Sequence, residues 1–70
     1  MSTVLRATVE SFDEHRGDGV LLDDFGERYY FHCVTLRDGT RTIPVGTRVR
    51  ARRRVGLMGC DEAEAVERDP

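Results

Sequence analysis

The segment Tyr29–Cys33 places four rings in succession, from two tyrosines, a phenylalanine and a histidine, and then a cysteine. On a β-strand, successive side chains point to opposite faces of the sheet. Tyr29, Phe31 and Cys33 then share one face, which we interpret as part of a hydrophobic core. Tyr30 and His32 share the other face, so a strand here presents two polar-tipped rings to solvent.

A second group of side chains that could bind a ligand is a run of arginines. All eleven basic residues are arginine, and five of them fall within residues 48–54. On a strand, Arg48, Arg50, Arg52 and Arg54 project to one face, where they could follow a phosphate backbone and release its counterions. The alternative, which we favour, is a solvated strand whose charge is balanced by the five carboxylates of residues 61–70. A third alternative is a protein interface, because Arg and Tyr are enriched there.

No other arrangement in the chain predicts catalysis, a metal site or a cofactor. Ser11, Asp13 and His15 lie close together in an exposed turn, where alternate residues do not orient a base toward a nucleophile. The Gly-Asp-Gly stretch at 17–19 lacks the lysine and the following helix of a phosphate-binding loop. We therefore expect a protein that is not an enzyme and that uses neither a metal nor a cofactor.

The two cysteines, Cys33 and Cys60, are too few and too far apart in the chain for a disulfide scaffold. They form no Cys-x-x-Cys pair, so a zinc site would need distant ligands as well. We expect Cys33 to be a small buried apolar residue. A Cys33–Cys60 bridge stays open as an alternative, although a reducing compartment disfavours it.

Length and composition limit the chain to one small domain, which we place at residues 1–70. Only 39% of the 70 residues are hydrophobic and none is Trp, so the core must be small. Charged residues make up 34%, above the usual quarter or so, as on a well-solvated surface. No apolar run is long enough to cross a membrane, and Met1–Arg6 lacks the layout of a secretion signal, so we expect a cytoplasmic protein.

Hydrophobic periodicity predicts short strands separated by glycine turns. Leu5, Ala7 and Val9 alternate with polar residues, which is typical of a half-buried strand. Further strands are predicted over 20–22, 28–34 and 47–55, and residues 62–67 fit either a last strand or a short helix. Turns at intervals of about ten residues predict a small all-β barrel of five strands.

Five segments, in order, carry motifs of one known family. Ala7–Asp13 is similar to its opening Gly-Thr-Val-Lys-Trp-Phe-Asn, Arg16–Leu21 to Lys-Gly-Phe-Gly-Phe-Ile, and Tyr29–Cys33 to Val-Phe-Val-His-Phe. Gly39–Val49 is similar to Gly-x-Arg-Thr-Leu-x-x-Gly-x-x-Val, and Gly59–Val66 to Gly-Pro-Gln-Ala-Ala-x-Val with one insertion. The chain thus resembles the cold-shock domain from about residue 5 to residue 67. The resemblance implies a five-stranded antiparallel OB-fold barrel that binds single-stranded nucleic acid.

The resemblance also implies a binding surface, because members of this family stack bases on exposed rings over a basic face. Carried across residue by residue, Phe12, Tyr30 and His32 keep a ring, and Arg16 keeps the positive charge. Arg48 and Arg50 complete the nucleic-acid-binding residues that we predict. The chain departs from the family pattern where Glu10 reverses a charge and where four positions lack a ring, namely Ser11, Asp18, Val20 and Cys33.

The leading functional hypothesis is a divergent bacterial cold-shock-like protein that binds single-stranded RNA or DNA weakly and with little sequence selectivity. It would act as an RNA chaperone or a regulator of expression. One alternative is an OB-fold protein-interaction module that has lost nucleic-acid binding, in which Tyr30 and His32 merely cover the barrel. Another is a translation-factor-like OB protein that docks on structured RNA through its arginine strand. The predicted core comprises Leu5, Val9, Leu21, Tyr29, Phe31, Ile43, Val49 and Val66.

Overall fold

The computed structural model describes residues 4–55 and 61–69 and contains five strands and one short 3₁₀-helix. The strands are β1 (Val4–Asp13), β2 (Asp18–Asp23), β3 (Arg28–His32), β4 (Arg48–Val55) and β5 (Asp61–Arg68), and the helix is η1 (Cys33–Thr35). The prediction of five strands is confirmed, and the last segment is a strand. The described residues contain no helix long and apolar enough to cross a membrane. Cys60 and the predicted loop around it lie outside the described residues.

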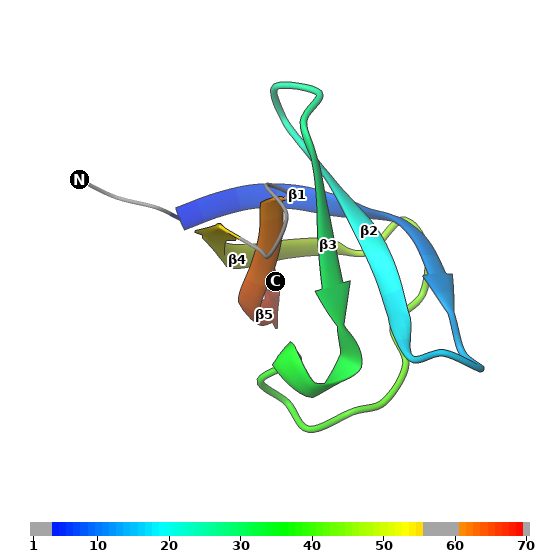
Figure 1. Cartoon of the computed structure of the whole chain (residues 1–70). Coiled ribbons are helices and arrows are strands. Elements are labelled where there is room, and N and C mark those ends of the chain that lie inside the picture. The colour runs from blue at the N-terminus through cyan, green and yellow to red at the C-terminus, as the bar shows by residue number, and fades with distance from the viewer. Residues whose placement is uncertain (1–3, 56–60, 70) are drawn as a thin grey trace.

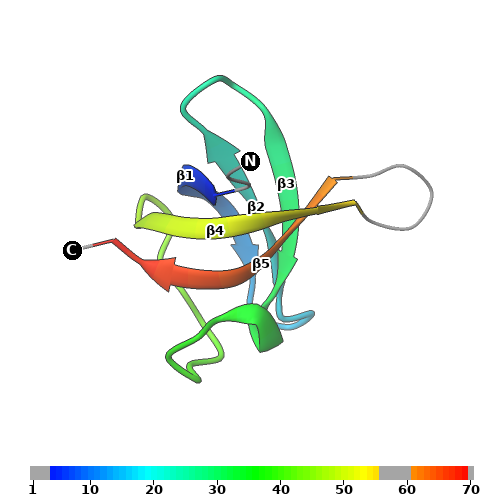
Figure 2. The ribbon, with the colours of Figure 1, turned by 90° about the vertical axis from the view of Figure 1, so that its left-hand side faces the viewer.

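The strands close into a barrel in the order β1-β2-β3-β5-β4, with β4 returning to β1 (Figures 1 and 2). Neighbouring strands are antiparallel except β3 and β5, which are parallel. The predicted all-β barrel of five strands is confirmed, whereas the prediction of a purely antiparallel barrel is wrong. A closed ring with an odd number of strands cannot reverse direction at every step, so one pair has to be parallel.

The first strand is long enough to belong to two sides of the barrel. Its first half, Val4–Thr8, pairs with β4, and residues 7–13 pair with β2. The register shifts between Val9 and Ser11, so Glu10 is an extra residue on β1. A bulge of this kind bends a strand and reverses the phase of its inward and outward side chains. It turns Ser11 outward and brings Phe12 against the core.

The core fills the barrel with side chains from all five strands and from the connection between β3 and β4. Seven of the eight predicted core residues are buried, and Leu5 is half-buried at the margin. Cys33 is also only half-buried, contrary to the prediction, because β3 ends at His32 and Cys33 begins η1. The other buried hydrophobic residues are Ala7, Leu36, Ala51 and Ala63.

The turn between β2 and β3 is organised by one buried carboxylate. Asp23 Oδ1 accepts hydrogen bonds from the backbone N–H groups of Phe25 (2.9 Å) and Glu27 (2.8 Å). Its Oδ2 accepts a hydrogen bond from the Tyr29 hydroxyl at 3.3 Å. Burial raises the pKa of the Tyr29 hydroxyl, and the charge of Asp23 raises it further. Asp23 therefore couples the turn to the buried ring of Tyr29.

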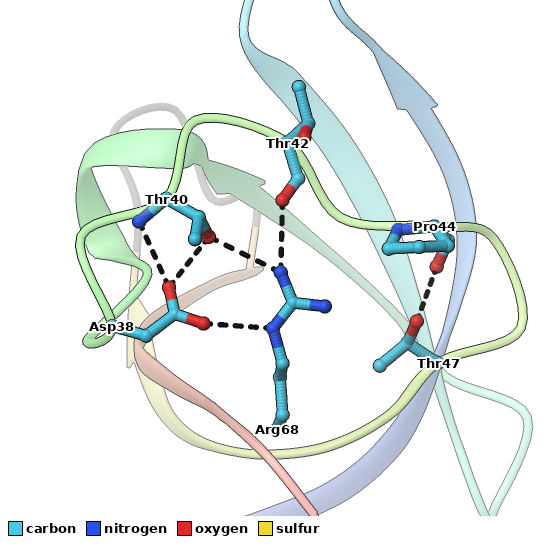
Figure 3. A network of polar contacts seen from close by, with 6 residues as sticks. All are labelled: Asp38, Thr40, Thr42, Pro44, Thr47 and Arg68. Carbon is cyan, nitrogen blue, oxygen red and sulfur yellow. Dashed lines mark hydrogen bonds and ion pairs between the residues drawn. The ribbon is translucent and has the colours of Figure 1, made fainter.

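The connection from η1 to β4 crosses the end of the barrel and is held by a polar network (Figure 3). Arg68 Nε donates to Asp38 Oδ2 at 2.8 Å, and Arg68 Nη2 donates to the Thr42 carbonyl at 3.1 Å. Asp38 Oδ1 also accepts from the backbone N–H and hydroxyl of Thr40. These bonds hold the connection against β5. Ile43, which follows Thr42 in the connection, packs into the core.

Candidate nucleic-acid interface

The outer face of β1, β2 and β3 carries the side chains that the sequence predicts for base stacking. The strand registers align Ser11, Val20 and Tyr30 in one row and Asp13, Asp18 and His32 in the next. Tyr30 is 59% exposed, whereas its neighbours Tyr29 and Phe31 are 5% and 3% exposed. The predicted alternation of faces along this strand is therefore confirmed. Tyr30 presents an aromatic ring to solvent beside the aliphatic side chain of Val20.

Phe12 has a different environment from Tyr30. Its ring is half-buried and stacks on the core ring of Phe31, with centroids 5.8 Å apart and planes inclined by 28°. Gly19 lies between the two strands that carry these rings, and a Cβ there would meet the Ser11 carbonyl and the ring of Phe31. The absence of a side chain at Gly19 thus allows Phe12 to reach the core. What remains exposed of the Phe12 ring faces the same surface as Tyr30.

A depression in this face brings three predicted site residues together. Phe12, Arg16 and Tyr30 all line it, together with Asp18 and Val20. Arg16 Nη2 lies 3.0 Å from Asp18 Oδ2, so the guanidinium group already has a carboxylate partner. The depression therefore offers aromatic and aliphatic surface, but its positive charge is offset within the site.

His32 sits at the end of β3, next to this depression in the strand register. Its Nδ1 accepts a hydrogen bond from the backbone N–H of Val34 at 3.2 Å, which caps η1. A neutral ring in this arrangement carries its proton on Nε2. The imidazole is exposed, and it also lies close to Gly17, whose backbone carbonyl accepts from Cys33 N–H at 2.7 Å. His32 thus combines a capping role with a ring that stays available to solvent.

The structure places Arg48 and Arg50 on a separate surface from Tyr30. Both lie on β4, which pairs with β1 and β5 and does not pair in the sheet with β2 or β3. Arg48 forms a bidentate pair with Asp24 at 3.0 and 3.3 Å and donates to the Thr8 hydroxyl at 2.9 Å. The hydrogen bond from Arg48 lowers the pKa of Asp24, and Asp24 in turn raises the pKa of Arg48.

The carboxylates of β5 face the arginine run across the β4–β5 ladder. Arg54 pairs with Glu62 at 3.1 Å, Arg53 with Asp61 at 3.4 Å, and Arg50 with Glu67 at 3.8 Å. This pairing supports the interpretation of a solvated strand with balanced charge for most of the run. The alternation of Arg48, Arg50 and Arg52 with buried Val49 and Ala51 confirms that these three share the outer face, whereas Arg53 and Arg54 are both exposed and burial does not separate their faces.

The exposure of Phe25 and the ion-pair partner of Glu10 were not predicted from the sequence. Phe25, in the β2–β3 turn, is 92% exposed and lines a second depression with Val4 and Leu5. The sequence signal for an exposed ring at Phe25 was the presence of an aromatic residue inside the turn Asp-Asp-Phe-Gly. Arg28 Nε binds Glu10 at 2.9 Å, and this hydrogen bond raises the pKa of Arg28. Glu10, the charge reversal relative to the cold-shock pattern, is thus partnered within the sheet.

No protein-family model matches the chain, and no curated protein matches it either. In residues 4–55 and 61–69, no group of three or more His, Cys, Asp or Glu side chains is placed to hold a metal ion.

Proposed function

We propose that this chain is a divergent cold-shock-like OB-fold protein that binds single-stranded RNA or DNA on the outer face of β1–β3. It would act in the bacterial cytoplasm as an RNA chaperone or a regulator of expression. The observation that carries the proposal is the exposure of Tyr30 on a sheet face whose neighbouring rings are buried. The strand order, with β3 beside β5, is consistent with an OB fold.

The same face indicates that binding is weak and tolerant of sequence. Each base stacked on an aromatic ring contributes about 1–3 kcal/mol, and every base offers a π-face. Tyr30 is the one predicted ring on this face that is neither packed on the core nor used as a cap. The pair between Arg16 and Asp18 reduces the attraction for phosphates. Stacking of one or two bases, with little electrostatic attraction between the protein and the phosphates, supports a modest affinity.

The decisive experiment is a titration of the protein with a fluorescently labelled oligothymidylate, read by anisotropy at low and at high salt. The proposal expects saturable binding at low salt that weakens as salt rises. A labelled duplex of the same length is the control, because its bases are stacked on one another inside the double helix and are not available to a protein ring. Equal affinity for duplex and single strand, or no binding at low salt, contradicts the proposal.

A second candidate function is protein binding, and one observation favours it. The almost fully exposed Phe25 and the half-exposed Val4 flank one depression, at a distance along the strands from Tyr30. Exposed aromatic side chains of this kind are enriched in protein interfaces. If the oligothymidylate titration shows no binding, the OB-fold protein-interaction module becomes the leading interpretation, and Phe25→Ala is the variant with which to test it.

A further inference from the structure

The outer surface of β4 and β5 faces the viewer in Figure 2. A third depression lies on this surface. Three guanidinium groups and one carboxylate line it, from Arg37, Arg50, Arg52 and Glu67. Ala51 and Ala65 also line this depression. Arg37 comes from the connection after η1 and the two other arginines from β4. Positive charge from two separate parts of the chain therefore converges here.

A bulge in β5 widens the spacing between the carboxylates of Glu64 and Glu67. Arg50 lies opposite Glu67 and Arg52 opposite Glu64, so two residues of β5, 65 and 66, oppose the single residue Ala51. Ala65 has a positive φ of 51°, a conformation that a non-glycine residue adopts at a cost. Without the extra residue, acidic side chains would continue to alternate along the outer face of β5. The bulge instead places the methyl group of Ala65 beside the arginines.

Arg37 pairs with Glu67 at 3.2 Å, but Arg50 and Arg52 are less well neutralised than Arg53 and Arg54. Arg50 approaches Glu67 and Asp69 only to 3.8 and 3.9 Å, near the limit for an ion pair. Arg52 forms no ion pair within 4.0 Å with any described residue, and the same holds for Arg6.

Arg6 makes the imbalance larger because it lies directly opposite Arg50 in the β1–β4 register. Side chains in such positions have Cβ atoms about 4.5–5.5 Å apart, and like charges there destabilise the sheet. An anion that binds between the guanidinium groups would remove this repulsion. The protein thus bears, in the free state, an electrostatic cost that a bound anion offsets.

We propose that Arg6, Arg37, Arg50 and Arg52 form a backbone-binding track for the phosphodiester groups of a nucleic acid, separate from the base-stacking face. The proposal deepens the proposed function and rests on it for the class of ligand. Alternate arginines on a strand are about 6.6–6.8 Å apart, so the track offers successive donors to a repeating anion. Each guanidinium group can bind phosphate oxygens through two parallel N–H donors.

The track is an open row across two strands, which suits a polymer better than a single small anion. Its arginines lie on β1, on β4 and in the connection after η1, whereas the stacking face lies on β1–β3. A strand that passes from one surface to the other along β1 would engage bases on one side and phosphates on the other.

The test compares an oligothymidylate with an abasic phosphodiester strand of the same length, because the second probe has phosphates and no bases. The double variant Arg6→Gln, Arg52→Gln should weaken binding of both probes. It should also reduce the slope of log K against log salt by about 0.7 for each phosphate that the variant no longer neutralises. The matched control is Arg53→Gln, Arg54→Gln, which removes the same charge from guanidinium groups that are already paired with Asp61 and Glu62.

Glu67→Gln is a second variant with the opposite expectation. It removes the carboxylate that lies 3.2 Å from Arg37 and 3.8 Å from Arg50, so both probes should bind more tightly. Because the substituted arginines are exposed and Glu67 is half-exposed, circular dichroism should show an intact barrel in each variant. An equal loss in the Arg6, Arg52 variant and in its control overturns the track, as does an unchanged affinity for Glu67→Gln.

The outcomes separate this proposal from the proposed function. If the oligothymidylate binds and the abasic strand does not, base stacking stands and the track fails. If both probes bind equally and Tyr30→Ala changes neither, the track stands and base stacking fails. If neither probe binds at low salt, both proposals fail.

Discussion

The ring of Phe12 rests on the ring of Phe31, and so couples the candidate binding face to the core of the barrel. The coupling passes over Gly19, which has no side chain to separate the strands. A substitution at Phe12 therefore affects both stability and binding, whereas a substitution at Tyr30 should affect binding alone. This difference allows surface roles to be separated from packing roles by experiment.

The first prediction contrasts two neighbours on β3. Tyr30→Ala should weaken binding of oligothymidylate by about 1–3 kcal/mol and leave the urea midpoint almost unchanged, because the ring is exposed. Phe31→Ala should lower the free energy of unfolding by about 3–5 kcal/mol, because it opens a cavity in the core. Tyr30→Phe keeps the ring and serves as the control. Full affinity in Tyr30→Ala would show that no base stacks on this ring.

The second prediction concerns the carboxylate that neutralises Arg16. Asp18→Asn should release the guanidinium group and tighten oligonucleotide binding, with a salt slope steeper by about 0.7 if the protein neutralises one more phosphate. Glu14→Gln, in the exposed turn before β2, makes the same change of charge at a residue that forms no ion pair with Arg16. Equal tightening in the two variants would mean that only net charge matters. Restoring rings with Asp18→Phe and Val20→Phe should raise affinity further.

The third prediction tests the turn between β2 and β3. Asp23→Ala should cost about 1–3 kcal/mol of stability, because two backbone N–H groups and the Tyr29 hydroxyl lose their acceptor. Asp24→Ala removes an exposed ion pair with Arg48 and should cost much less. Urea unfolding of the two variants measures the difference. Similar midpoints would show that the turn holds its shape without the buried carboxylate.

The fourth prediction is a pH dependence of the network in Figure 3. Hydrogen bonds from Thr40 and Arg68 hold the pKa of Asp38 well below its ordinary value of 3.8. A depressed pKa in the folded state adds stability above pH 3.8, and this contribution is lost as the pH falls below that value. Asp38→Asn should therefore make the free energy of unfolding less dependent on pH in the acid range. Near neutral pH, the pH dependence of the variant should match that of the parent protein. An acid limb identical in both proteins would show that the bonds do not persist in solution.

The sequence predicts strands and faces well where alternation is regular. The pattern from Tyr29 to His32 correctly separates buried from exposed rings, since period two applies along an unbroken strand. It fails where a strand contains an extra residue. The bulge at Glu10 moves Phe12 toward the core, and the bulge at Ala65 spaces Glu64 and Glu67 unevenly. Neither bulge can be recognised from the local amino-acid composition.

Relationships between distant strands were harder still to predict. Repulsion between Arg6 and Arg50 depends on the β1–β4 register, which no local pattern specifies. A parallel pair could have been deduced, because five strands in a closed ring require at least one, but the ring does not specify that it is β3 and β5. The half-burial of Cys33 follows from the early end of β3, and strand boundaries are poorly defined by propensity.

The pairing of β5 between β3 and β4 makes the last of the five strands the one that seals the barrel. Until it docks, β3 and β4 each expose an unpaired edge, and such edges promote association between chains. On a ribosome, the first four strands must wait for residues 61–68 to emerge before the ring can close. We therefore expect folding to be slow for so short a chain and to complete after synthesis of this strand. The period before closure is when the nascent chain is most exposed to aggregation.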